Sequence, residues 1–489
     1  MGNNGNPVGQ FAKYAMFGLG AFAIIDPRRG FYTLLLLTAY LDGAKRFLIL
    51  GDRTSYLDLY WVLGIAPAVM LGLCVGVTLS LITGKRPWRK EYLWLYVASF
   101  LGFGVLGGAA LLSSGGGVSQ DGIAGVVNAG AYVPMLFVVP ILFPTGRELK
   151  KMLWTAMLIF VPPGLYMIWQ GIFGLSDLEY DYLLSGLTQE SRILYEQEVL
   201  RPFSTLNGAS TASVIFSVFA VMALVLSGQR IQINRSRRFF GVLISLLFLV
   251  GAWFTVSRTG WACGVAAAMA AVLYRTRTTT FGLYASGVAL ALGLILASDY
   301  LLETKAMGKL QSEMSGDTRG DARTERAITM GTMDGRFESF SFLKNNKDIW
   351  TPFGVAAAGK QDPREYFRIH DAITDYLVRI GYIPLGLLMI IITVSLFVIH
   401  RRLLRLQDDQ VRALAILAMA CAFGIGSGAL VSPSQLRVYP MNVYFFCFIG
   451  VVLSGLVHKV RDWPQVDDRE DTEPEGEMMA RPRLVNAVN

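Results

Sequence analysis

Long apolar runs separated by short polar connections dominate the chain. The clearest runs span residues 57–82, 154–172, 206–226 and 383–399. A transmembrane β-barrel would instead show short segments of alternating polarity. Since a helix needs about 20 apolar residues to cross the hydrocarbon core, the pattern predicts an all-α polytopic membrane protein with about 12 to 13 transmembrane helices.

Basic and non-basic connections alternate along the chain. The basic ones are residues 85–90, 147–151, 230–238, 275–277 and 400–412, and the others are residues 113–122, 174–205, 257–259, a long polar stretch from 299 to 374, and 432–437. Lys and Arg concentrate in cytoplasmic loops, so the basic set is predicted to be cytoplasmic and the other set external. The same rule accounts for the net charge of +8 without a nucleic-acid partner.

Composition agrees with a membrane protein. Hydrophobic residues make up 53% of the 489 and charged residues 16%, whereas soluble domains carry about 25% charged residues. The first ten residues lack a basic n-region, so no cleavable signal peptide is expected. The four cysteines lie inside apolar runs without metal-ligand spacing and are predicted to be small core residues: Cys74, Cys263, Cys421 and Cys447.

The apolar pattern divides the chain into four parts. Residues 1–298 are predicted to form the N-terminal transmembrane helices, and residues 299–374 a large periplasmic loop that contains short helices. Residues 375–459 form the C-terminal transmembrane helices. Residues 460–489 are rich in Asp, Glu, Pro and Arg and are predicted to be a disordered cytoplasmic tail.

Two apolar segments are interrupted by charge. Asp42, Lys45 and Arg46 break the run from 31 to 50, which predicts a short helix followed by an interfacial segment. Ser257 and Arg258 divide residues 253–273 into two arms, which predicts two helices joined by a tight outer turn.

Three arginines fall on the predicted outer face, where the long loop makes chemistry most accessible. They are Arg201, Arg258 and Arg336. An arginine near hydrocarbon is costly and often functional, and a guanidinium binds phosphate oxygens through two parallel hydrogen bonds. Each also has a structural interpretation: a membrane-edge anchor for Arg201, a snorkelling or paired side chain for Arg258, and a salt-bridged loop residue for Arg336.

His370 is the one histidine of three that the charge pattern places outside, because His400 and His458 lie at predicted cytoplasmic boundaries. It borders an apolar stripe at helical spacing, formed by Ile369, Ile373, Leu377 and Ile380, on a helix predicted to begin near Pro363. A neutral imidazole there can accept a proton from a sugar hydroxyl. The alternative is a capping or hydrogen-bonded histidine.

Metal and nucleotide sites are not indicated. The acidic residues of the long loop form neither a calcium-loop pattern nor a histidine-rich cluster. The glycines at 115–117 follow no strand and lack a following Lys-Ser/Thr pair, which a phosphate-binding loop requires. No metal and no cofactor is therefore expected.

The order of these motifs resembles the O-antigen ligase and polysaccharide polymerase superfamily of bacterial inner membranes. The resemblance covers about residues 201–386 and the pattern of spans. It rests on residues 201–210 before a central span, the Ser-Arg-Thr-Gly turn at 256–261, Gly-Arg at 334–337, Pro-Phe-Gly at 350–354, and the stretch from His370 to Gly386. The family often has Asn after the histidine, where this chain has Asp371.

The resemblance implies a GT-C-like fold and an active site facing the periplasm. Its members transfer a glycan from undecaprenyl pyrophosphate to an acceptor sugar without metal. The resemblance implies that Arg258 and Arg336 hold the pyrophosphate with Arg201 nearby, and that His370 deprotonates or orients the acceptor hydroxyl. At the position where this chain departs from the family, the carboxylate of Asp371 can orient the imidazole ring, and Asp371 is assigned to the substrate-binding set. Attack opposite the leaving group implies inversion.

Three main functions remain open at this point, beside the smaller alternatives of a protein-glycosylating ligase and a purely structural membrane scaffold. A polymerase uses another lipid-linked repeat unit as acceptor, and the Arg-Pro-Phe-Ser-Thr run at 201–205 favours this activity. A ligase uses lipid A–core instead. A transporter or flippase is the alternative outside this superfamily, although few interior charges are present beyond the stretch from Asp42 to Arg46. Chain-length regulator and flippase proteins are expected partners of a polymerase.

Overall fold

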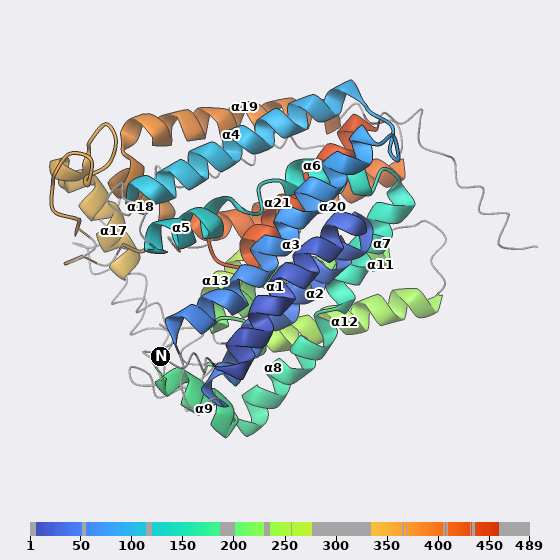
Figure 1. Ribbon diagram of the computed structural model, residues 1–489, viewed down its shortest axis with the longest axis horizontal. Helices are drawn as coiled ribbons and strands as arrows, with labels where there is room; N and C mark the ends of the chain where they lie inside the picture. The colour runs from blue at the N-terminus through green and yellow to red at the C-terminus, as the bar shows by residue number, and fades with distance from the viewer. Residues whose placement is uncertain are drawn as a thin grey trace, which may run out of the picture.

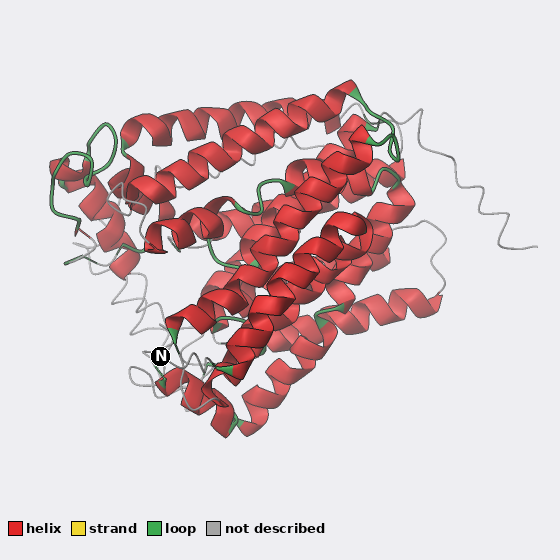
Figure 2. Ribbon diagram, in the orientation of Figure 1, coloured by secondary structure: helices red, strands yellow, loops and turns green. Residues whose placement is uncertain are grey.

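The computed structural model describes residues 6–50, 55–113, 120–185, 201–228, 235–255, 257–275, 334–363, 366–367, 369–403, 406, 409–430, 432 and 436–458. Residues 299–333 of the predicted periplasmic loop and the predicted tail (460–489) lie outside these ranges, so the four-part division of the chain stays a prediction. Within the described residues the ordered elements are all helices (Figure 2).

The helices run mainly between two opposite ends of the molecule (Figure 1). They are α1 (Pro7–Ile25), α2 (Pro27–Ala44), η1 (Lys45–Leu50), α3 (Tyr56–Ile82), α4 (Lys90–Ser113), α5 (Gln120–Gly130), α6 (Met135–Leu142), α7 (Gly146–Leu158), α8 (Val161–Phe173), α9 (Asp177–Leu184), α11 (Ala209–Gly228), α12 (Arg235–Phe254), α13 (Arg258–Arg275), α17 (Asp334–Asn345), η3 (Lys347–Ile349), α18 (Ala372–Ile380), α19 (Tyr382–Leu403), α20 (Asp409–Ser427), η5 (Gly428–Leu430) and α21 (Met441–Val457).

Helix α11 forms the centre of the bundle. It packs against α12, α13 and α20, and α20 in turn packs against α21. Its most apolar stretch is 78% buried, whereas that of α19 is 6% buried. A helix that is apolar on all sides and buried belongs to the interior of a bundle. The apolar side chains that α19 exposes, such as Ile390 and Val394, are those expected of a helix facing lipid.

Seven described helical segments are long and apolar enough to cross a membrane, and two further apolar helices are shorter. The prediction of a polytopic α-helical membrane protein is therefore confirmed. The predicted number of 12 to 13 crossings stays a prediction, because residues 276–333 lie outside the described part. One of the seven is the segment Gly146–Phe173, which contains the run at 154–172 and consists of α7 and α8 joined by a two-residue turn.

Predicted cytoplasmic positions lie together at one end of the bundle. Arg28 pairs with Glu148 from the basic connection at 147–151. Near the end of α21, the Nε2 atom of His458 lies 2.8 Å from the carbonyl oxygen of Pro140. The opposite end, at the left of Figure 1, holds α9, α17 and α18. The structure thus separates two sets of polar connections, while their compartments stay predictions.

The interrupted segments break where the charges indicated. Helix α2 ends at Ala44 and continues as the 3₁₀ helix η1, and α12 and α13 are separate helices on either side of residues 255–257. The helix predicted to begin near Pro363 begins instead at Ala372. The reason is a local cap: Asp371 has extended backbone angles, and its carboxylate accepts a hydrogen bond from the Thr374 amide at 2.7 Å.

Two glycines join α18 to the preceding segment. Gly354 and Gly381 both have positive φ, 95° and 79°, and a Cβ added to either would overlap the backbone of the other's segment. Their contact lets the Tyr382 amide donate to the Thr351 carbonyl at 3.0 Å. The Pro-Phe-Gly motif at 350–354 therefore has a structural role: its glycine permits the close approach that fixes the start of α19.

Substituting Gly381 tests this junction. Gly381→Ala adds a Cβ that meets backbone atoms at a positive φ, so the free energy of unfolding should fall by about 1–3 kcal/mol. The matched control is Gly386→Ala, because Gly386 lies on α19 with no atom near its added Cβ. Thermal unfolding in detergent micelles measures both variants. Equal melting temperatures for the two would contradict the proposed role of this contact.

Candidate functional site

Arg201 lies beside the start of α13. The side chain is half-buried, and its Nε atom donates a hydrogen bond to the carbonyl oxygen of Thr255 at 3.3 Å. Thr255 begins the connection that leads from α12 to Arg258, the first residue of α13. Two predicted site residues separated by 57 positions therefore belong to one neighbourhood of the fold.

Arg258 is held at this position by close packing of α13 against α11. The Ser257 carbonyl oxygen accepts a hydrogen bond from the Ser213 hydroxyl at 3.1 Å. Gly260 lies so close to Ser213 that an added Cβ would overlap it. Arg258 itself is half-buried. A cation at a helix N-terminus is unfavourable by itself, whereas the same place favours an anion, so the arginine and the helix dipole both favour a bound phosphate.

A buried arginine organises the loop that carries Arg201. Arg46 of η1 is 4% exposed and pairs with Glu179 of α9. Its guanidinium also donates to the carbonyl oxygens of Ser204 and Leu206 and lies 4.5 Å over the ring of Phe203. Burial lowers the pKa of Arg46, and the carboxylate of Glu179 opposes that shift.

Gln170 of α8 completes this network. Its Oε1 atom accepts hydrogen bonds from the amides of Phe203 and Ser204, at 3.2 and 2.7 Å. Its Nε2 atom donates to Glu179 at 2.5 Å, and the Tyr166 hydroxyl donates to the same carboxylate oxygen at 3.0 Å. Ser204 has a positive φ of 55°, a strained conformation that these contacts hold in place.

The remaining charges of the interrupted segment act in the same way. Lys45 and Asp42 are both buried and form an ion pair. Lys45 also donates to the Asn207 side chain at 3.2 Å. The charges that interrupt the apolar run from 31 to 50 therefore hold the loop that follows Arg201 in place.

His370 and Asp371 are tied to α17 by one buried hydroxyl. Ser339 is fully buried, donates to the Asp371 carboxylate at 2.6 Å, and accepts from the His370 amide at 3.3 Å. The other carboxylate oxygen of Asp371 caps α18 through Thr374. Both oxygens of Asp371 thus bond to the chain, which favours a positioning role over direct substrate contact.

Arg336 belongs to the first turn of α17, three residues before Ser339. Its backbone is therefore on the same short helix that anchors His370. The side chain of Arg336 lies outside the described part of the structure, so its predicted phosphate contact stays a prediction. His370 is half-buried. It precedes Asp371, the N-cap of α18, and therefore lies outside the helix.

Sequence analysis missed an ionic cluster on α18. Asp375 is 3% exposed and pairs with Arg379, whose Nε atom lies 2.9 Å from both carboxylate oxygens. It also pairs with Arg437, whose guanidinium lies 5.4 Å from the Tyr376 ring. Burial raises the pKa of Tyr376. The sequence places Arg437 at the end of a predicted outer connection, which marks it as a candidate site residue. The sequence does not show that Asp375 is its partner.

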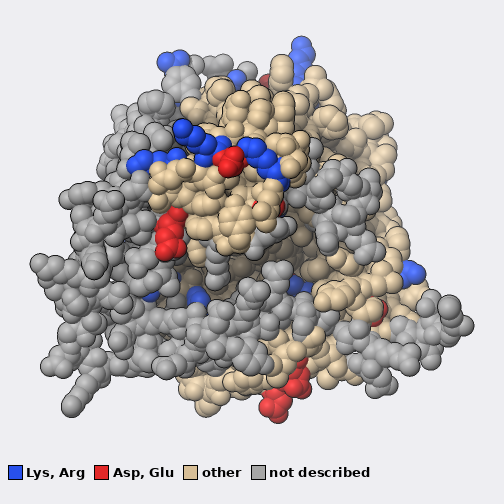
Figure 3. Space-filling view, turned by 90° about the vertical axis from the view of Figure 1, so that its left-hand side faces the viewer, with Lys and Arg blue, Asp and Glu red and all other residues tan. Residues whose placement is uncertain are grey.

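The predicted residues form two pairs that share one end of the molecule. Arg201 and Arg258 make one pair, and Arg336 and His370 make the other through α17. Helix η5 contacts both α13 and α18, which links the two neighbourhoods. Figure 3 looks onto this end and shows basic side chains gathered in a band, with an acidic one among them, above a recessed surface.

Within the described ranges, no group of three or more His, Cys, Asp or Glu side chains is placed to hold a metal ion. Metal independence stays a prediction. Cys263, Cys421 and Cys447 are buried, Cys74 is half-buried and all four are free thiols, as expected of core residues. Comparisons with protein-family models, curated proteins and solved structures found no match.

Replacing Glu179 tests the buried network. Glu179→Gln leaves the charge of Arg46 buried without its carboxylate, so the free energy of unfolding should fall by about 3–5 kcal/mol. Asp348→Asn is the matched control, because its ion pair with Lys360 is largely exposed and should contribute about 0–1 kcal/mol. Unfolding in detergent micelles measures both. A loss no larger than that of the control would refute the network's structural importance.

Removing the Ser339 hydroxyl tests the link between α17 and α18. Ser339→Ala leaves one oxygen of the buried Asp371 carboxylate without its donor, so stability should fall by about 1–3 kcal/mol. Amide hydrogen exchange should quicken at the start of α18. The control is Ser341→Ala, whose hydroxyl meets the exposed Asn345 amide and should change stability by about 0.5 kcal/mol or less. Unchanged exchange in Ser339→Ala would exclude the link.

Proposed function

We propose that this protein is a polysaccharide polymerase of the bacterial inner membrane, with a GT-C-like fold and an active site facing the periplasm. It transfers an undecaprenyl-pyrophosphate-linked glycan to the acceptor sugar of another lipid-linked repeat unit. The observation that supports this most strongly is the grouping of the predicted residues: Arg201 bonds to the connection that leads into Arg258, and α17, which carries Arg336, is tied to the backbone of His370.

The leaving group determines what the site must supply. Undecaprenyl pyrophosphate already leaves readily, so the main requirement is stabilisation of negative charge as the anomeric C–O bond breaks. Guanidinium groups held in place before the reaction can supply it. Arg258 and Arg336 bind the pyrophosphate with Arg201 nearby, and the N-terminus of α13 adds its dipole to Arg258.

The acceptor is activated from the other side of the sugar. The acceptor hydroxyl oxygen attacks the anomeric carbon while the bond to the pyrophosphate oxygen breaks. His370 takes the hydroxyl proton, and the electron pair of the broken bond stays with the lipid pyrophosphate. Attack opposite the leaving group inverts the anomeric centre. Asp371 acts by fixing the backbone at His370, and chain-length regulator and flippase proteins are the expected partners.

The buried charges at Lys45 and Arg46 are the observation that bears on the transporter alternative. Transporters often place charged residues within broken helices, and Lys45 and Arg46 are buried beside a helix break. These two charges are engaged by Asp42 and Glu179 and by backbone carbonyls. Such contacts suit a rigid support for the Arg201 loop better than a site that alternates between two states.

Two substitutions test the proposed chemistry. Purified protein in detergent is incubated with a lipid-linked repeat unit and no added metal, and products are resolved by gel or mass spectrometry. Wild-type protein should produce a ladder of longer lipid-linked glycans. His370→Ala should abolish the ladder and retain lipid binding. Arg258→Lys should also abolish it, because lysine keeps the charge but loses the two-pronged geometry.

Arg29→Lys is the matched control, because Arg29 is a largely exposed arginine of α2 on the opposite end of the bundle. It should leave the ladder unchanged. Transfer only after addition of lipid A–core would identify a ligase instead. A normal ladder in either test variant would refute the assigned roles, and the absence of transfer with both acceptors would favour transport.

A further inference from the structure

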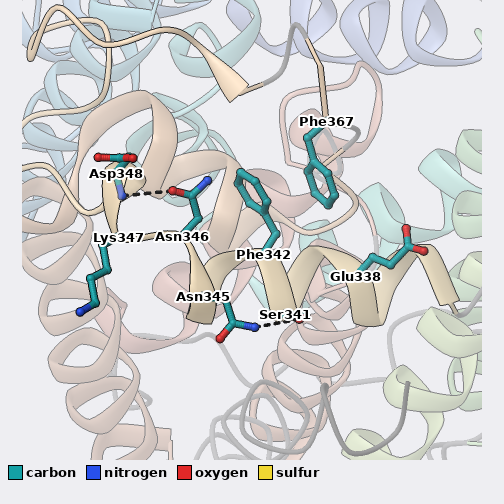
Figure 4. Close-up of a pocket in the computed structure, with 8 residues that line it drawn as sticks. All are labelled: Glu338, Ser341, Phe342, Asn345, Asn346, Lys347, Asp348 and Phe367. Carbon is teal, nitrogen blue, oxygen red and sulfur yellow. Dashed lines mark hydrogen bonds between the residues drawn. The ribbon is translucent and has the colours of Figure 1, made fainter. Parts of the chain in front are cut away.

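An open pocket of about 640 Å³ lies on the surface formed by α17 and η3. Figure 4 shows Phe342 and Phe367 pointing toward one another above α17, with Glu338 to one side and Asn346 and Asp348 to the other. None of the functions assigned above to Arg201, Arg258, Arg336 or His370 uses this pocket. Its position on α17 places it on the same short helix that anchors His370.

The aromatic pair gives the pocket a fixed apolar wall. The rings of Phe342 and Phe367 stack with centroids 4.3 Å apart and planes 10° apart. Both rings also pack against a small core made by Leu343, Ile349 and neighbouring residues. A ring held in this way offers an apolar face without losing further side-chain freedom on binding. The C–H face of a pyranose ring is the surface that stacks on such a wall.

The other lining groups include carboxylate and amide groups, which are of the kind that bind sugar hydroxyls. Glu338 presents a carboxylate. Asn345 and Asn346 present amide groups of which one atom each is engaged, because Asn345 Nδ2 donates to Ser341 at 3.2 Å and Asn346 Oδ1 accepts from the Asp348 amide at 3.1 Å. A neighbouring pair of sugar hydroxyls can donate to a carboxylate and accept from an amide. The lining carboxylates Glu338 and Asp348 are matched by Lys347 in the lining and by Lys360, which pairs with Asp348, and no arginine lines the pocket. A neutral polyhydroxyl ligand therefore suits this pocket better than a phosphate.

The pocket lies within reach of the proposed reaction centre. Ser339, which bonds to the His370 amide and the Asp371 carboxylate, lies between Glu338 and Ser341 in the sequence of α17. Since a helix advances about 1.5 Å per residue, the pocket residues from 338 to 345 extend about 10 Å along the axis from there. An oligosaccharide with its end at His370 can continue along this helix.

We propose that the pocket binds the acceptor glycan, a few sugar units away from the hydroxyl that reacts. Calling the ligand an acceptor rests on the proposed transfer reaction, whereas binding of the glycan can be measured without any reaction. The stacked pair of Phe342 and Phe367 holds one sugar ring, and the carboxylate and amide groups fix its hydroxyls. Such a site lets the enzyme select its acceptor by the repeat unit rather than by the lipid.

Binding is tested with the full-length protein in detergent and a lipid-free repeat-unit oligosaccharide, released from its carrier by mild acid. Saturation-transfer NMR and a titration give the contacts and the dissociation constant. Glu338→Ala and Phe367→Leu should each weaken binding about tenfold, since one removes a charged acceptor and the other an aromatic face. Glu338 is exposed, so its replacement leaves the fold intact even if Phe367→Leu loosens the small core.

Two control variants change neighbours that do not line the pocket. Lys344→Ala alters an exposed side chain on the same helix, and Tyr366→Leu alters the 62% exposed aromatic residue next to Phe367. Both should bind the oligosaccharide as wild type does. Undetectable binding to wild-type protein, or equal binding by Glu338→Ala and Lys344→Ala, would overturn the proposal.

The two proposals fail in different ways. If the pocket variants lose the oligosaccharide but no variant or wild-type protein transfers glycan, the pocket stands as a glycan-binding site and the transferase proposal fails. If transfer depends on His370 while the pocket variants bind and react as wild type does, the pocket proposal alone fails. A raised KM for the acceptor with unchanged kcat in Glu338→Ala would support both.

Discussion

The buried pairing of Arg46 with Glu179 is the interaction on which the candidate site depends. An unpaired arginine in this environment would be costly, and its cost is offset only when every donor finds an acceptor. The acceptors are a carboxylate from α9 and carbonyl groups of the loop at 203–206. Satisfying Arg46 therefore forces η1, α9 and that loop together, and Arg201 takes its place at the edge of α13 as a consequence.

A second buried polar pair organises the part of the candidate site around His370. Ser339 and Asp371 satisfy each other while one of them also caps α18, so α17 cannot move without exposing a buried carboxylate. The glycine contact between Gly354 and Gly381 fixes the other end of α18. The backbone of His370 is thus held at the fixed start of α18. A proton acceptor needs such a fixed position, because transfer requires hydrogen-bond distance to the reacting hydroxyl.

The proposed phosphate-binding and sugar-binding regions differ in the chemical groups that each contains. Phosphate binding requires permanent positive charge beside a low-dielectric region, which Arg258 and the start of α13 provide. Sugar recognition requires apolar ring faces and many neutral or acidic hydrogen-bonding groups in contact with water, which the surface of α17 and η3 provides. The contacts through η5 and Ser339 bring these two kinds of surface to one end of the bundle.

The sequence by itself determined the membrane class, the break at Lys45, and the break before Arg258, because hydropathy and charge act locally through the cost of placing a group in hydrocarbon. It also indicated Arg201 and Arg258 as candidate site residues, although not that Arg201 bonds to the connection before α13. Only the tertiary structure decided that the helix after His370 begins at Ala372, and that Arg46 supports a loop about 160 residues away in the chain. Partners of buried charges are chosen by packing between distant helices, and no local pattern records which carboxylate or carbonyl group will be there.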